Sequence, residues 1–178
     1  MFMLYGVAVG VVAGYLRGGG LGRLADLPLR WAWLALVALG AQVVLFFPGV
    51  GTTLGGLAPA AYVLSSIAVL AVVLRNLRLP GVPLIAAGAA CNLVAIVANG
   101  GFMPASPDAL ASLGWTEAQG FSNSVVIADP ALAPLTDIFA LPDWLPFANV
   151  FSIGDVLIAV GVAVVVAWGM GRRTAPEA

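Results

Sequence analysis

Five long apolar runs, separated by shorter polar segments, constrain this chain more than any other feature of its sequence. A membrane-spanning helix needs about 20 apolar residues, with a range of roughly 17–25. We expect five such spans, at about residues 2–16, 31–47, 57–74, 83–98 and 153–170. Only 8% of the residues are charged, whereas a soluble domain carries roughly 25%. The sequence therefore predicts an all-α integral membrane protein, a five-span transmembrane helix bundle that forms one membrane domain.

The arginines predict the orientation of the bundle. The chain has no lysine, and its basic residues lie after the first, third and fifth spans, at Arg17, Arg23, Arg30, Arg75, Arg78, Arg172 and Arg173. With five spans, these three segments lie on one side, which the positive-inside rule makes cytoplasmic. The N-terminus is then outside, the C-terminus is cytoplasmic, and residues 100–151 are outside. We expect residues 171–178 to be a disordered tail.

Glycines recur at every fourth position of the first apolar run. Gly6, Gly10 and Gly14 share one helical face, so another backbone can approach them closely. This face predicts a packing groove inside the bundle, and the alternative is a homodimer interface.

The segment between the fourth and fifth spans, at residues 99–152, is not a plain membrane helix. At about 50 residues it exceeds the roughly 12–15 residues above which a loop is usually functional or disordered. It is too aromatic for a solvated coil, with Phe102, Trp115, Phe121, Phe139, Trp144, Phe147 and Phe151. We therefore expect an ordered outer lid over the mouth of the bundle.

A short helix is predicted within this lid. Ser106 suits the N-cap position, Pro107 the first helical residue and Gly114 the stop.

Asp155 lies at the start of the fifth span, and an acid near a membrane span is a functional candidate. However, Ser152 and Asp155 fit a capping box in which aspartate replaces the usual glutamate or glutamine. Helix capping is the first interpretation. A polar cluster with Asn99 or Asn149 is the second, and catalysis or transport is the third.

Few polar side chains lie inside the spans. Ser65 and Ser66 are expected to bond back to their own helix. Asn92 predicts a hydrogen bond between two helices, because a buried amide in lipid needs a partner; a substrate or ion contact is the alternative. Gln42 is the one polar residue of the second span.

The residue types argue against most catalytic chemistry. There is no histidine, and the one cysteine, Cys91, lies in an apolar run. The commonest metal ligand and the usual general base are therefore missing. We assign no catalytic residue, metal or cofactor and expect no nucleic-acid partner. Asp137 and Asp155 are the two carboxylates that we would test for general acid–base catalysis.

The pattern of the outer segment resembles a known family. The resemblance is carried by Asn99, Gly100, Gly101, Met103 and Pro104, by residues 136–139, and by residues 146–155. These segments resemble a family of bacterial multi-pass membrane proteins of unknown function, over nearly the whole chain. The resemblance implies a bacterial inner-membrane protein and brings no known activity. The candidate binding residues are Asn99, Gly100, Gly101, Met103, Pro104, Asp137, Asn149, Ser152 and Asp155.

Three functions are open at this point. The first is a binding or assembly component of the bacterial inner membrane that presents the acidic, aromatic-rich lid to a partner membrane protein or a second copy. The second is a transporter or channel for a small solute. The third is a membrane enzyme that acts on a lipid or lipid-linked substrate at the outer interface. For each of these functions, the protein is expected to lie in the lipid bilayer and contact its lipids.

Side-chain positions distinguish these functions. Convergence of Gln42, Ser65 and Asn92 on a cavity favours transport. Asn99, Asp137 and Asp155 in one outer pocket favour an enzyme or ligand site. A dry bundle with an exposed glycine face favours assembly.

Overall fold

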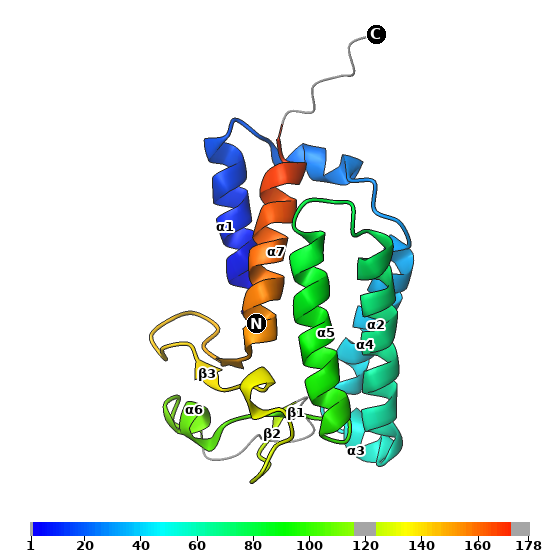
Figure 1. The fold of residues 1–178 in the computed structure, drawn as a ribbon, viewed down its shortest axis with the longest axis vertical. Coiled ribbons are helices and arrows are strands. Elements are labelled where there is room, and N and C mark those ends of the chain that lie inside the picture. The colour runs from blue at the N-terminus through cyan, green and yellow to red at the C-terminus, as the bar shows by residue number, and fades with distance from the viewer. Residues whose placement is uncertain (1, 116–123, 172–178) are drawn as a thin grey trace.

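The computed structural model describes residues 2–115 and 124–171, and the chain is mostly helical over these ranges (Figure 1). Its long helices are α1 (Met3–Leu16), α2 (Ala32–Leu45), α4 (Leu57–Arg75), α5 (Val82–Ala98) and α7 (Ile153–Gly169). Each one coincides with an apolar run, so the prediction of a helical fold is confirmed. The expected disordered tail lies outside the described residues except for Gly171, and the aromatic Phe121 of the lid lies outside them too.

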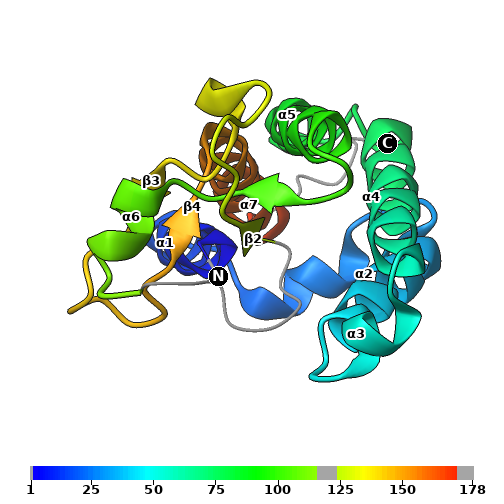
Figure 2. The same cartoon turned by 90° about the horizontal axis from the view of Figure 1, so that it is seen from below.

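The long helices form a curved row in the spatial order α1, α7, α5, α4 and α2 (Figures 1 and 2). The last helix of the chain is therefore inserted between α1 and α5. Because α7 contacts both neighbours along much of its length, it packs more extensively than the other long helices.

Fewer helices are long enough to span a membrane than the sequence analysis predicted. Among the described residues, α4 alone is long and apolar enough to cross a membrane, while α1, α2, α5 and α7 are apolar but have 10–17 residues each. A helix of 14 residues such as α1 is about 21 Å long, against a hydrocarbon core of about 30 Å. By length and composition the structure thus marks one span, rather than the five predicted.

Glycines bring α1 and α7 into backbone contact. Gly6, Gly10 and Gly14 are buried. A Cβ atom at Gly6 would clash with the Ala159 carbonyl, and one at Gly10 would lie 2.7 Å from the Ala163 carbonyl oxygen. This glycine face is therefore covered by α7 of the same chain, as a packing groove inside the bundle would be, and it is not the exposed face that would favour assembly.

A second set of glycines joins α5 to α7. A Cβ atom at Gly88 would clash with the Gly154 carbonyl, and one at Gly161 would lie 2.7 Å from the Gly81 carbonyl oxygen. Gly81 and Gly88 are seven residues apart, as are Gly154 and Gly161, so each pair lies on one face of its helix. Close approach of two helices requires small residues at such positions.

The connection between α2 and α4 contains a helix that the sequence analysis did not predict. Val50–Leu54 form this short helix, α3. Gly49 begins it with a φ of 86°, and the Thr52 and Thr53 hydroxyls both donate to the Gly49 carbonyl. These local hydrogen bonds stabilise a helical turn that composition alone did not indicate. A further 3₁₀ helix, η1 (Leu21–Asp26), follows α1.

The outer segment lies at the end of the bundle where α5 ends and α7 begins (Figure 1). Its parallel pair joins β1 (Met103–Pro104) to β2 (Ser124–Val125), and its antiparallel pair joins β3 (Phe139–Ala140) to β4 (Val150–Phe151). It also contains the short helix α6 (Pro107–Ala111) and the 3₁₀ helix η2 (Ala133–Leu135).

The predicted short helix of this segment is confirmed. Ser106 caps α6 by accepting a hydrogen bond from the Ala109 backbone N–H, and Gly114 has a φ of 70° beyond its end. Buried side chains gather around α6 in a small core of Ala105, Ala109, Leu110 and Val150.

Candidate functional site

A polar cluster stands where α7 begins. The Ser152 Oγ accepts a hydrogen bond from the Asp155 N–H at 3.1 Å, and the Asp155 Oδ2 accepts one from the Ser152 N–H at 3.0 Å. Ser152 has extended backbone angles, as an N-cap residue does. The capping box predicted from the sequence is thus confirmed.

Asn92 of α5 completes this cluster. Its Nδ2 donates to the Asp155 Oδ1 at 2.9 Å, and its Oδ1 accepts from the Ser152 Oγ at 2.9 Å. The absence of a side chain at Gly154 makes this possible, because a Cβ atom there would clash with the Asn92 Oδ1. The predicted hydrogen bond between two helices is confirmed. Asp155 does belong to a polar cluster, but its partner is Asn92 rather than Asn99 or Asn149.

Asn99 ends α5 and ties it to the outer segment. Its Oδ1 accepts from the Ala131 N–H at 2.8 Å, while its Nδ2 donates to the carbonyls of Ala131 at 2.9 Å and Ala95 at 2.8 Å. Gly100 and Gly101 follow with φ values of 72° and 91°. A Cβ atom at Gly101 would meet Pro59 of α4. These three residues therefore form the turn that reverses the chain against α4.

Asn99→Ala is expected to lower the free energy of unfolding by about 1–2 kcal/mol, because three hydrogen bonds are lost and partly replaced by water. Residues 126–135 should also become more sensitive to limited proteolysis. Thermal unfolding in detergent measures the first effect. Thr52→Ala, which removes only a local hydrogen bond on an exposed side chain, is the control. An Asn99→Ala protein as stable as this control would contradict the assigned role.

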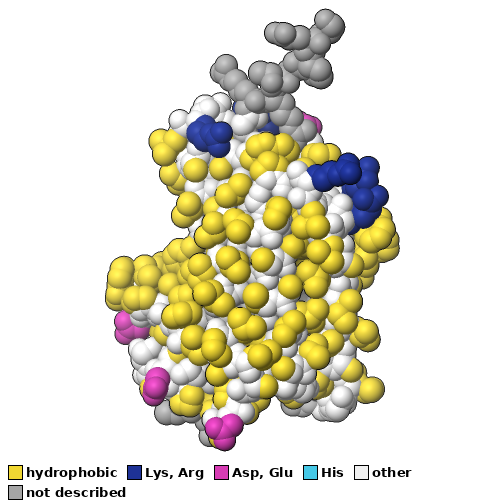
Figure 3. Space-filling view, in the orientation of Figure 1, with side chains coloured by type: hydrophobic (Ala, Val, Ile, Leu, Met, Phe, Trp, Pro, Cys, Tyr) yellow, Lys and Arg dark blue, Asp and Glu magenta, His cyan; other side chains and the backbone are white. Residues whose placement is uncertain are grey.

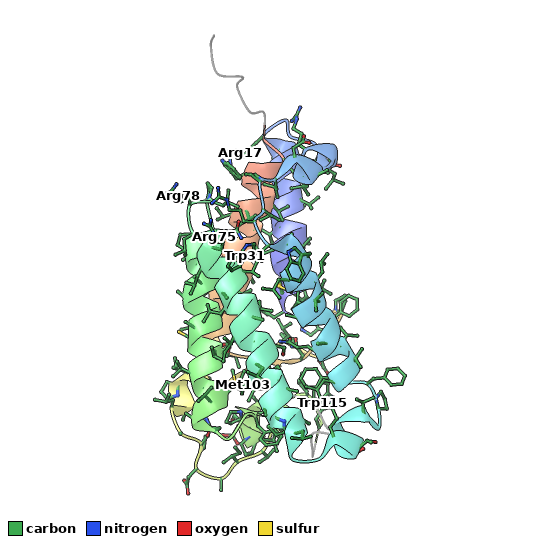
Figure 4. The ribbon with its side chains drawn as sticks, turned by 90° about the vertical axis from the view of Figure 1, so that its right-hand side faces the viewer. Arg17, Trp31, Arg75, Arg78, Met103 and Trp115 are labelled. Carbon is green, nitrogen blue, oxygen red and sulfur yellow. The ribbon has the colours of Figure 1, made fainter. Side chains whose placement is uncertain are left out.

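Met103 and Pro104, which form β1, are buried, as are Thr136 and Asp137. The Asp137 N–H donates to the Pro104 carbonyl and its own carbonyl accepts from the Ser106 N–H, both at 2.9 Å. Met103 belongs to the apolar core between the outer segment and the helices, and Figure 4 shows it at this end of the bundle. Asp137 is thus an internal residue of the outer segment, not part of an exposed acidic surface.

Asn149 precedes β4. Its Nδ2 donates to the Val150 carbonyl at 2.9 Å, and its backbone carbonyl accepts from the Leu141 N–H at 3.0 Å. Its Oδ1 is buried and has no hydrogen-bond partner among the described residues.

An outer pocket shared by Asn99, Asp137 and Asp155 would favour an enzyme or ligand site, but Asp155 bonds to Asn92 while Asn99 bonds to Ala131. The polar residues whose convergence on a cavity would favour transport are also divided between two helix pairs. Gln42 of α2 donates to the Ser65 Oγ of α4 at 3.1 Å, whereas Asn92 of α5 bonds to α7.

The serines of α4 behave as the sequence predicted. Both Ser65 and Ser66 donate to the Tyr62 carbonyl of their own helix at 2.8 Å. Among the described residues, no group of three cysteine, aspartate or glutamate side chains is placed to hold a metal ion.

The comparison with known families identifies the chain. A model of a family of unknown function, DUF5317, matches residues 26–167. The chain belongs to this family. The DUF5317 match covers the helices from α2 to most of α7, and so it includes Asn92, Ser152 and Asp155. No curated protein and no solved structure matches the chain.

Proposed function

We propose that this DUF5317 protein is a five-span protein of the bacterial inner membrane that acts as a binding or assembly component through its outer segment. The observation that carries the proposal is the pairwise bonding of polar side chains between helices inside a bundle whose outer surface is strongly apolar. Such a bundle has an outer surface suited to lipid. It has few polar side chains left to bind a solute or substrate.

The exposed side chains support the membrane placement of all five long helices. Large hydrophobic side chains are exposed on each of them, including Val9, Val12, Leu36, Val43, Leu64, Val97 and Val160. Figure 3 shows hydrophobic side chains spread over the middle of the visible face. A soluble monomer rarely exposes apolar patches larger than a few hundred Å². The shorter helices fit a bilayer that thins locally around them, at a cost of fractions of a kcal/mol per Å.

The distribution of charge supports the proposed orientation. The five described arginines stand at or near the end opposite the outer segment, where Figure 4 labels Arg17, Arg75 and Arg78. Figure 3 shows arginine side chains at one end and most of the visible acidic side chains at the other. By the positive-inside rule, the arginine end is cytoplasmic and the outer segment is outside.

The outer segment offers a surface for a partner. Trp144 is 77% exposed and Phe147 is 60% exposed, and they stand beside the exposed Asp143. Exposed aromatic side chains contribute most strongly to protein interfaces. The outer segment is also held to the bundle, because Phe2 at the start of α1 stacks on Phe151 with ring centroids 4.3 Å apart. The segment can therefore present Trp144 and Phe147 from a fixed position.

Native mass spectrometry of the protein extracted in mild detergent tests this function. A stoichiometric partner chain, or a second copy, is expected. Trp144→Ala with Phe147→Ala should weaken that association at least tenfold, since two exposed anchors are removed. Trp33→Ala, which removes another exposed tryptophan, from α2, is the control. A lone chain that retains a small molecule in its outer segment would contradict assembly and favour a ligand site.

A further inference from the structure

A buried asparagine holds the start of α2 against the end of α4. The Asn76 Oδ1 accepts from the Arg30 N–H at 2.8 Å, and its Nδ2 donates to the Arg30 carbonyl at 2.9 Å and to the Val72 carbonyl at 2.8 Å. Asn76 is only 7% exposed. The position of Arg30 is therefore set by an internal hydrogen-bond network, although its own side chain is exposed.

Trp31 and two further arginines surround this contact. The guanidinium carbon of Arg75 lies 5.9 Å from the centre of the Trp31 ring, a cation–π distance. Arg78 lies three positions after Arg75, at the same end of the bundle (Figure 4). Trp31 also has a φ of 59°, a left-handed backbone conformation that is strained for a bulky residue. We call Arg30, Trp31, Arg75 and Arg78 the basic corner.

The charge of the basic corner is not balanced within the described part of the chain. All three of its arginine side chains are exposed. No hydrogen bond or ion pair with another described residue engages their guanidinium groups. At this end of the bundle Asp26 is the one described acid, against five described arginines. The three exposed guanidinium groups of the corner therefore create a locally positive surface that attracts anionic groups.

We propose that the basic corner binds the phosphate headgroup of an acidic phospholipid in the cytoplasmic leaflet. Guanidinium groups bind phosphate oxygens in a bidentate manner, and tryptophan prefers the level of the headgroups. The apolar side chains next to the corner, Trp33, Leu74 and Leu77, are 66%, 50% and 42% exposed and provide a surface for acyl chains. This inference rests on the proposed membrane placement.

Lipid titration followed by native mass spectrometry tests the site. The wild-type protein is expected to retain phosphatidylglycerol in preference to phosphatidylcholine. Arg75→Gln with Arg78→Gln should weaken this binding about 30-fold, because each arginine that contacts the anionic headgroup contributes about 1 kcal/mol and 1.4 kcal/mol is tenfold. The affinity of the Arg75→Lys with Arg78→Lys protein for phosphatidylglycerol should lie between those of the wild type and the double glutamine variant. In the lysine variant the charge remains but the bidentate geometry is lost.

Arg17→Gln is the matched control, because it removes one exposed arginine from the same end of the bundle. It should change lipid binding less than twofold, whereas Arg78→Gln alone should weaken it about fivefold. The proposal would be overturned if Arg17→Gln and Arg78→Gln weakened lipid binding equally. It would also be overturned if the wild-type protein retained phosphatidylglycerol and phosphatidylcholine equally, or bound inorganic phosphate as tightly as phosphatidylglycerol. Alkaline carbonate extraction distinguishes a failure of the lipid site from a failure of the proposed membrane placement. If the placement holds, all variants should stay in the membrane fraction.

Discussion

Asp155→Asn is expected to lower the free energy of unfolding by about 1.5–3 kcal/mol, the contribution of a hydrogen bond to a charged group. The Asp155 carboxylate accepts hydrogen bonds from the Asn92 Nδ2 and the Ser152 N–H. An amide has one oxygen, so its NH₂ group must face one of these two donors. If Asp155 acted only as a charge at the helix start, the loss would be about 0.3–1 kcal/mol.

The reciprocal exchange gives a sharper test of the same contact. Asn92→Asp alone places two carboxylates against each other and should cost about 1.5–3 kcal/mol, because a hydrogen bond to a charged group is lost at this partly buried contact. Combining it with Asp155→Asn reverses the donor and the acceptor, so the amide at position 155 can donate to the carboxylate at position 92. The Ser152 Oγ can still donate to position 92.

The double variant should therefore recover at least half of the loss caused by Asn92→Asp. Thermal unfolding of the four proteins in one detergent gives the coupling free energy. Losses that simply add would contradict the described contact between Asn92 and Asp155.

Gly88→Ala should lower the free energy of unfolding by about 1–3 kcal/mol, because a methyl group overpacks the close contact between α5 and α7. Its Cβ atom would meet the Gly154 carbonyl, which is backbone and cannot move aside alone. Gly40→Ala in α2 is the matched control, since nothing lies within 4 Å of the added Cβ.

The control should be neutral or more stable by up to about 1 kcal/mol, since alanine favours a helix over glycine. Thermal unfolding in detergent compares the two variants. Equal stability of the Gly88→Ala and Gly40→Ala proteins would show that α5 and α7 are not in backbone contact.

Local features of the fold could be predicted from the sequence. Apolar runs located the five long helices, because periodic apolar residues and their polar ends are a local signal. The caps at Ser106 and Ser152 were predicted because the residues that complete a cap lie within three positions. The helix in residues 50–54 was missed, since glycine and threonine have low helix propensity and the stabilising hydrogen bonds to Gly49 depend on geometry.

Contacts between distant segments could not be predicted. Asn92 and Asp155 are separated by 63 positions, and either could have bonded to several polar residues. The spacing of Gly81 from Gly88, and of Gly154 from Gly161, was a signal that sequence reasoning overlooked. Even so, it could not show that α5 pairs with α7, because the order of helices in a bundle depends on which faces fit each other.

Cysteine accessibility in right-side-out membrane vesicles tests the central claim most directly. In a Cys91→Ser background, single cysteines are introduced by Ser112→Cys in the outer segment and by Ala25→Cys in η1, at two exposed positions. A membrane-impermeant maleimide should label the Ser112→Cys protein in intact vesicles. It should label the Ala25→Cys protein only after permeabilisation. Labelling of the Ala25→Cys protein in intact vesicles, or protection of the Ser112→Cys protein, would contradict a membrane protein whose outer segment faces away from the cytoplasm.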